Sequence, residues 1–130
     1  MGKTRTGKSA EYRLSFARTR DERDDSVKTL FLLETVRQFA AFRYEISVRE
    51  EIEDREIRLA ILGLKAPDLG LPAAGPAEFR RAYALEGEYT VTVRGLDGTV
   101  VAFPLQVRAG VPSVRRLPEP SFLEVIAPTS

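Results

Sequence analysis

Leu85-Glu-Gly-Glu-Tyr-Thr-Val-Thr-Val-Arg-Gly-Leu-Asp-Gly-Thr-Val-Val-Ala-Phe-Pro-Leu-Gln-Val107 is the stretch from which we predict the fold. Apolar and polar residues alternate in two runs, which is the period-2 pattern of strands packed on one side. The apolar members of the two runs are Tyr89, Val91, Val93, Val101, Phe103, Leu105 and Val107. Between the runs, Asp97 and Gly98 tolerate the positive φ of a tight turn. The stretch therefore predicts a β-hairpin.

The length and composition of the chain are those of one ordinary globular domain. Its 130 residues are 43% hydrophobic and 30% charged, so a core can form without a disulfide or another covalent staple. The chain has no cysteine and no histidine, which excludes thiolate nucleophiles, histidine triads and histidine zinc sites. No pair of carboxylates is isolated among apolar residues, where a raised pKa would suit acid/base work. We therefore expect a protein that is not an enzyme.

The first part of the chain contains one clear boundary and one ambiguous segment. Residues 1–11 are small, polar and basic, and we interpret them as a flexible arm that precedes a single domain over residues 12–130. An alternating segment that begins at Tyr12 predicts the first strand. Residues 27–43 fit both a helical face and an interrupted strand alternation. We favour the strand; a helix there would make the fold α+β.

The middle of the chain predicts a second hairpin and a long loop. Clean alternation from Phe42 to Val48 is followed by acidic residues typical of a hairpin tip. The return strand has Ile57, Leu59 and Ile61 on one face, and Leu62 and Leu64 lie just beyond it. Gly63 between the two leucines indicates a bulge. Residues 66–78 contain three prolines and two glycines and predict a loop. About seven strands at these spacings predict an all-β antiparallel sandwich.

One part of the hairpin resembles a known family. The run Leu85-Glu86-Gly87-Glu88-Tyr89-Thr90-Val91-Thr92-Val93 resembles the penultimate strand of immunoglobulin-like sandwiches, including fibronectin type III domains. In those domains a leucine, a glycine and Tyr-x-Val-x-Val build a tyrosine corner. The resemblance implies that the ring of Tyr89 packs between the sheets and that its hydroxyl bonds to main chain just upstream. The chain departs from the family in having no tryptophan and no cysteine. The resemblance implies a scaffold for binding and names no ligand.

Basic residues are concentrated at the N-terminus. The first twenty residues carry six lysines or arginines against one glutamate, whereas the whole chain has a net charge of only +1. Residues 2–9 match the phosphate-loop pattern G-x-x-x-x-G-K-[ST], but no strand precedes the match and no helix follows it, so we interpret it as chance. The basic side chains give an alternative function, binding of an anion such as nucleic acid; they are Lys3, Arg5, Lys8 and Arg13. The acidic residues just downstream would repel phosphate, so this alternative ranks second.

The predicted recognition site is the loop at residues 66–78, because loops at the end of a rigid sheet commonly carry binding. Leu69 and Leu71, if exposed, would contact a partner, which we expect to be a protein or a carbohydrate. The segment from Phe122 to Ile126 offers a second route, by pairing with the sheet edge of a neighbour or with its own sheet. Pro104 cannot donate to a ladder, so we predict that its strand lies at an edge or that its partner bulges there. The sequence thus predicts a non-catalytic interaction module.

Metal, membrane and location are also constrained by the sequence. The acidic segments at residues 21–25 and 50–56 lack the spacing of a calcium loop and are interpreted as solvated turns, so we expect no metal or cofactor. No apolar run approaches the ~20 residues of a membrane span. No apolar segment follows the basic start, so we expect a cytoplasmic protein if Met1 is the native start. An extracytoplasmic location is expected if a signal sequence was removed.

Overall fold

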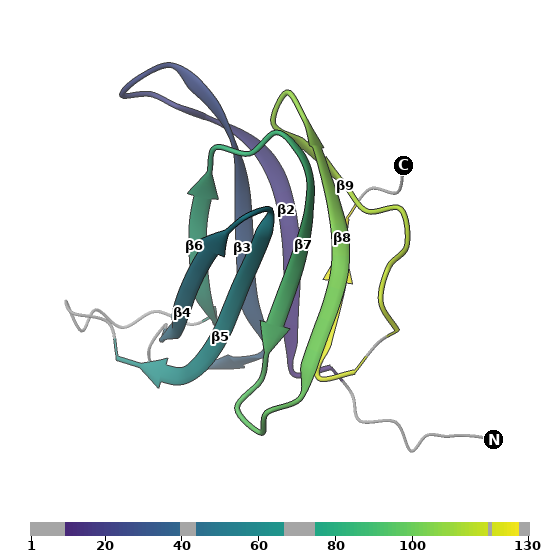
Figure 1. The fold of residues 1–130 in the computed structure, drawn as a ribbon. Helices are drawn as coiled ribbons and strands as arrows, with labels where there is room; N and C mark the ends of the chain where they lie inside the picture. Colours follow the sequence, from purple (N-terminus) through teal and green to yellow (C-terminus); the bar gives the residue numbers. More distant parts are fainter. Residues whose placement is uncertain (1–9, 40–43, 67–74, 120, 128–130) are drawn as a thin grey trace.

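The computed structural model describes residues 10–39, 44–66, 75–119 and 121–127 of the chain. These residues form strands and turns (Figure 1), and none of them belongs to a helix that could cross a membrane. The all-β class predicted from the sequence is confirmed. The strands are β2 (Tyr12–Asp21), β3 (Ser26–Phe39), β4 (Glu45–Glu53), β5 (Glu56–Lys65), β6 (Gly75–Tyr83), β7 (Gly87–Arg94), β8 (Val100–Arg108), β9 (Val111–Ser113) and β10 (Leu123–Ile126).

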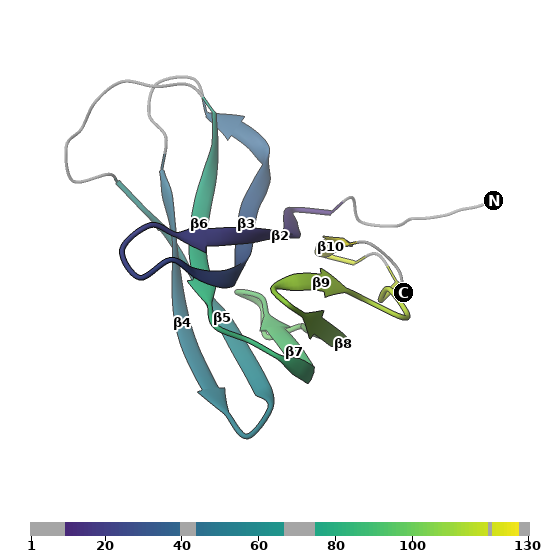
Figure 2. The same ribbon diagram turned by 90° about the horizontal axis from the view of Figure 1, so that it is seen from above.

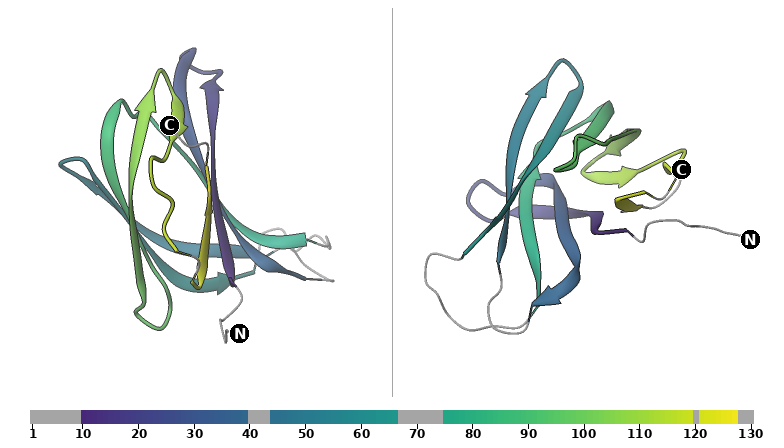
Figure 3. Two further views of the ribbon diagram at one scale, coloured as in Figure 1. Left: turned by 90° about the vertical axis from the view of Figure 1, so that its right-hand side faces the viewer. Right: turned by 90° about the horizontal axis from the view of Figure 1, so that it is seen from below.

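These strands belong to one hydrogen-bonded sheet with the order β10-β2-β3-β6-β4-β5-β7-β8-β9. Neighbouring strands are antiparallel except for three parallel contacts, which join β10 to β2, β4 to β6 and β5 to β7. The sheet curls into a half-barrel, so that β8 and β9 come back towards β2 and β10 (Figures 1 and 2). Figure 3 shows the same curl from the side and from below.

The strand count and the layering differ from the sequence prediction of about seven strands in an antiparallel sandwich. The described residues form one mixed sheet of nine strands, whose curl brings the inward faces of distant strands together. Alternation identifies the buried face of a strand but not its neighbours. A curled sheet and a sandwich bury the same sequence pattern, so the pattern alone could not distinguish them.

The ambiguous segment is a strand as far as it is described, because β3 covers Ser26–Phe39, whereas residues 40–43 lie outside the described part. Its inward residues alternate as Thr29, Phe31, Leu33 and Thr35, and each is less than one-tenth exposed. The two buried hydroxyls bond to main chain, since Thr29 donates to the carbonyl of Gly110 at 3.2 Å and Thr35 donates to that of Arg37 at 2.7 Å. Two of the inward positions of β3 are therefore threonines, and these polar residues interrupt the apolar alternation by which a strand is predicted from sequence.

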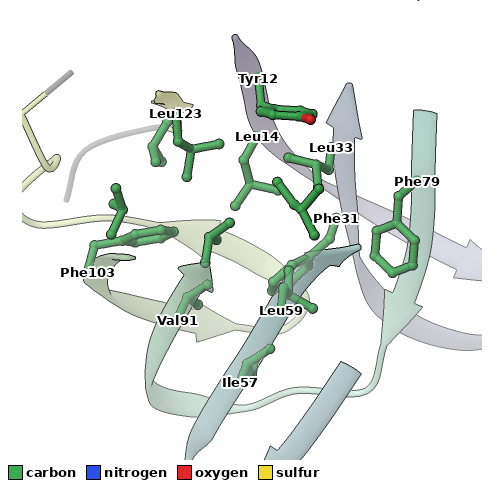
Figure 4. Close-up of a cluster of buried hydrophobic side chains, with 14 of the residues drawn as sticks. Tyr12, Leu14, Phe31, Leu33, Ile57, Leu59, Phe79, Val91, Phe103 and Leu123 are labelled. Atoms are coloured by element: carbon green, nitrogen blue, oxygen red, sulfur yellow. The ribbon is translucent and has the colours of Figure 1, made fainter. Parts of the chain in front are cut away.

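The core fills the inside of the curl (Figure 4). The alternating residues of the predicted hairpin point into it, and Val91, Val93 and Leu105 are at most 1% exposed. β2, β3 and β5 supply the facing side chains, and the fully buried large residues among them are Leu14, Phe31, Leu33, Ile57 and Leu59. The hairpin prediction is confirmed in register, because β7 pairs with β8 from Gly87 opposite Val107 to Arg94 opposite Val100.

The turn after β8 joins one end of the sheet to the other. Arg18 of β2 donates from Nε to the carbonyl of Ala109 at 3.1 Å, and Thr29 of β3 bonds to the next carbonyl. Gly110 is buried and has a φ of 78°, and a Cβ at this residue would overlap Cγ1 of Val27. Side chains and a close backbone approach, rather than a continuous ladder, therefore hold the half-barrel closed at this end.

Candidate functional site

The predicted site residues are only partly within the described chain. Leu69 and Leu71 of the predicted recognition loop lie outside the described residues, as do Lys3, Arg5 and Lys8 of the basic arm. Arg13 is described: it lies in β2, with its Nε 3.3 Å from Oε1 of Glu124 in β10. This arginine is thus engaged with a carboxylate on the neighbouring strand.

The residues predicted to be structural lie around the β7–β8 hairpin. The hydroxyl of Tyr89 donates to the carbonyl of Glu86 at 3.2 Å and accepts from the N–H of the same residue at 3.1 Å. In the turn, Gly98 has a φ of 89°, and the side chain of Asp97 accepts from the N–H of Thr99 at 2.9 Å. Tyr89 therefore fixes the entry to β7, while the Asp-Gly pair shapes the turn that leaves it.

The acidic segments lie at two hairpin turns, and within the described residues no group of three acidic side chains could hold a metal ion. In the β2–β3 turn, Oδ2 of Asp21 is 2.7 Å from Nζ of Lys28. The hydrogen bond from Lys28 lowers the pKa of this carboxyl well below its usual range. In the β4–β5 turn, Asp54 and Arg55 both have positive φ, as a tight two-residue hairpin requires. We therefore interpret these acidic residues as parts of the two hairpin turns.

The strongest candidate surface is the outer half of β5, next to the predicted loop. β5 pairs with β7 only from Glu56 to Ala60, where Ala60 lies opposite Arg94. From Ile61 to Lys65 the strand is paired with β4 on one side, and no described strand pairs with its other side. Figure 1 shows this part of β5 extending past the end of β7. Within the part of the chain that the structure describes, the main-chain N–H and C=O groups on that side form a free sheet edge.

Two leucines on this free edge are exposed. Leu62 is 51% exposed and Leu64 is 44% exposed, whereas Ile61 before them is 3% exposed. The register between β4 and β5 shifts here, because Gly63 lies opposite Ser47 while Ile61 lies opposite Val48, so that Leu62 is the extra residue of a bulge. The bulge predicted at this glycine is confirmed, and Gly63 has a φ of 141° that favours glycine.

A turn beside the free edge explains why β7 does not continue along β5. The N–H of Gly95 donates to the carbonyl of Thr99 at 2.8 Å, which directs the chain away into β8. This turn presents two more exposed apolar residues, Leu96 at 64% and Val100 at 53%. We call Leu62, Leu64, Leu96 and Val100, together with the free edge at Ile61 to Lys65, the β5 edge surface.

Sequence reasoning described Leu62 and Leu64 only as residues beyond the return strand, and did not identify them as a site. The available signal was a pair of leucines around a glycine immediately before a proline-rich loop. The sequence did not indicate where β7 ends, and the edge of β5 is free only beyond the point where β7 turns away. The predicted loop residues Leu69 and Leu71 follow the same strand within seven residues of Leu64.

A second polar cluster lies where β4 and β6 run side by side. Their main-chain register contains one pair, Glu45 with Glu78. Five residues further on, Oε1 of Glu50 accepts from the hydroxyl of Tyr83 at 2.6 Å, and its Oε2 is 2.9 Å from Nη2 of Arg81. Burial, and then the hydrogen bond to Glu50, raise the pKa of Tyr83. The cluster satisfies its own groups, and we interpret it as a fastening between the two strands.

A shallow hollow on the β7–β8 hairpin is small. Its volume is about 80 Å³, and it is lined by Glu88, Pro104, Leu105, Gln106 and Arg115. Sites for drug-sized ligands occupy roughly 300–1,000 Å³. The β5 edge surface is therefore the stronger candidate, because both its main chain and its exposed leucines are available for contact.

Comparisons of the chain with protein-family models, with curated proteins and with solved structures find no match.

Proposed function

We propose that this protein is a non-catalytic interaction module that binds a partner protein at the β5 edge surface. The observation that carries the proposal is a strand edge from Ile61 to Lys65 with which no other described strand pairs, and which presents two leucines, each more than two-fifths exposed. Free edges of this kind accept an extended peptide as an added strand. Main-chain hydrogen bonds then provide affinity, while the leucines provide apolar contacts.

A protein fits this surface better than a carbohydrate. The free edge offers a row of N–H and C=O groups, and an extended polypeptide has the complementary spacing of such groups. The exposed side chains beside it are aliphatic, namely Leu62, Leu64, Leu96 and Val100. Exposed aliphatic groups are typical of protein contacts rather than of carbohydrate contacts.

Two expectations from the sequence accompany this proposal. Leu69 and Leu71 remain predicted contacts, and their closeness in sequence to Leu64 makes them candidates to extend the same surface. The immunoglobulin-like or fibronectin type III-like character remains a prediction from the β7–β8 hairpin. The proposed binding depends on the free edge and does not require that family relation.

The test uses a phage-displayed library of random twelve-residue peptides, selected against the immobilised protein. We expect enrichment of extended peptides with apolar residues at alternate positions, because one face of an added strand meets the leucines. Binding should fall at least about tenfold in Leu62→Asp, which places a charge on the edge. Val111→Asp is the matched control, because Val111 of β9 is also 51% exposed. Selected peptides that bind Leu62→Asp as tightly as Val111→Asp would contradict the proposal.

A further inference from the structure

The apolar part of the β5 edge surface, from Ile61 to Leu64, differs from the unpaired edges of β8, β9 and β10 in carrying no proline and no charge. β9 pairs with β8 only at Gln106–Arg108, so the side of β8 away from β7 is unpaired before that stretch, but β8 carries Pro104 there. β9 contains Pro112, and β10 contains the charged Glu124. Prolines and charges on an edge oppose strand addition. β5 has neither from Ile61 to Leu64, and its one charge, Lys65, lies at the end of the free stretch.

The sequence of this edge is symmetric about its glycine, since it reads Leu62-Gly63-Leu64. A twofold interface uses the same patch on both copies and needs a patch that complements itself. We propose that the partner at this surface is a second copy of the chain, whose β5 pairs antiparallel with the first across Gly63. This inference rests on the proposed function. In this register, Leu62 of each copy lies opposite Leu64 of the other.

Charge is compatible with this register. Antiparallel pairing centred on Gly63 places Lys65 of one copy opposite Ile61 of the other, so the two lysines lie at opposite ends of the paired stretch. Four residues of strand separate them by roughly 13 Å, which exceeds the ~8 Å screening length at physiological salt. At the centre, Gly63 has no side chain, and a Cβ there would meet nothing within 4 Å in the same copy, so the face of the sheet is open at this position.

The turn between β7 and β8 enlarges the contact. Ala60 lies opposite Arg94, so the turn that follows begins beside Ile61. A second β5 lying along the free edge would therefore end against Leu96 and Val100 of the first copy. The four exposed side chains provide on the order of 300 Å² of apolar surface per copy, close to the apolar share of the smallest specific interfaces.

The first experiment measures the mass of the purified full chain by sedimentation equilibrium from about 1 to 100 μM. We expect the wild type to form a dimer, and Leu62→Asp to raise the dimer dissociation constant at least tenfold while the circular dichroism spectrum stays unchanged. Val111→Asp, with equal exposure at the mutated side chain, should dimerise as the wild type does.

The second experiment tests the register by cross-linking, because the chain contains no cysteine of its own. A mixture of Leu62→Cys and Leu64→Cys chains, oxidised together, should form a disulfide-linked dimer of one chain of each kind. Opposed residues of an antiparallel pair have Cα atoms about 4.5–5.5 Å apart, which suits a disulfide. Either variant alone should cross-link several times more slowly.

The outcomes separate this inference from the proposed function. A wild-type chain that is monomeric at 100 μM, yet binds selected peptides through Leu62, would overturn the second-copy inference and leave the proposed function standing. A dimer that is equally stable in Leu62→Asp would place the contact elsewhere and overturn the inference as well. Selected peptides that bind Leu62→Asp as well as the wild type would contradict the proposed function itself.

Discussion

Gly110 lies where the two ends of the curled sheet meet, and no larger residue fits there. A Cβ at this position would overlap Val27 and lie 3.3 Å from Cγ of Arg18, and its φ of 78° is also unfavourable for other residues. We expect Gly110→Ala to lower the free energy of unfolding by about 2–4 kcal/mol, from overpacking and backbone strain together. Urea unfolding followed by circular dichroism measures this.

Gly98 provides the control for that substitution. Its φ is 89°, but a Cβ there would approach only the flexible end of Arg94 at 3.9 Å. Gly98→Ala should therefore cost about 1–2 kcal/mol, which is the backbone strain without the overlap. If Gly110→Ala and Gly98→Ala lower the free energy of unfolding equally, the close contact between residue 110 and Val27 does not hold the half-barrel closed.

Tyr83 carries a raised pKa, and this shift makes a prediction about alkaline pH. Because its folded-state pKa lies above the ordinary value of 10.0, the associated stability is present below about pH 10 and is lost as pH rises towards the folded-state pKa. Tyr83→Phe should flatten the fall of the melting temperature above about pH 10. At neutral pH the same variant should lose about 1 kcal/mol, because the hydrogen bond to Glu50 is missing.

The partner of this tyrosine offers an independent check. Glu50→Gln removes the charge that helps to raise the pKa of Tyr83, so tyrosine absorbance should titrate at lower pH in this variant than in the wild type. Burial is the larger cause of the shift, and it should leave part of the shift in place. An unchanged titration curve would contradict the assignment of Glu50 as a contributor.

At the scale of the element, Pro104 shows how an edge is protected. The N–H of Thr90, opposite Pro104, donates to the carbonyl of Arg55 at 2.9 Å. Thr90 and Pro104 therefore form a non-hydrogen-bonded pair of the β7–β8 ladder, and the nitrogen of Pro104 faces away from β7. β9 does not reach this position, since its pairing begins at Gln106. The sequence predicted an edge or a bulging partner at Pro104. β8 lies between β7 and β9 in the sheet, and it forms an edge of the described sheet only over the part that contains Pro104.

Replacing this proline should expose the edge. Pro104→Val restores an N–H on the unpaired side, so we expect more light scattering on heating, while the free energy of unfolding changes by less than about 1 kcal/mol. Ala102→Val is the matched control, because Ala102 is also exposed on β8 and the change adds apolar surface without adding an N–H. Equal scattering by both variants would attribute the effect to hydrophobicity alone.

At the scale of the whole molecule, the charge of the chain favours the interaction module over the anion-binding alternative. The net charge is only +1, and Arg13, the described member of the basic arm set, pairs with Glu124. We expect the protein to elute from heparin at or below physiological salt. Changing Lys3, Arg5 and Lys8 to glutamine should leave self-association unchanged. Tight, steeply salt-dependent DNA binding that these changes abolish would instead favour the anion-binding alternative.

Much of the buried face could be predicted from the sequence, but the order of the strands could not. Alternation identified the inward residues of β7 and β8 because every second side chain there is apolar. It could not indicate that β5 pairs in parallel with β7, although β6 lies between them in the sequence, because the choice of neighbouring strand depends on long-range packing. The free edge of β5 follows from this pairing, so the candidate site was beyond local patterns as well.

The parallel ladder between β10 and β2 has a consequence for synthesis. Leu123 lies opposite Tyr12, so the first strand of the described chain obtains its outer neighbour from residues made more than a hundred positions later. A growing chain on the ribosome thus displays the outer edge of β2 until its final strand emerges. Pairings so distant in sequence slow folding and lengthen the exposure of open edges. We therefore expect nascent chains halted before residue 123 to need more chaperone protection than chains that contain β10.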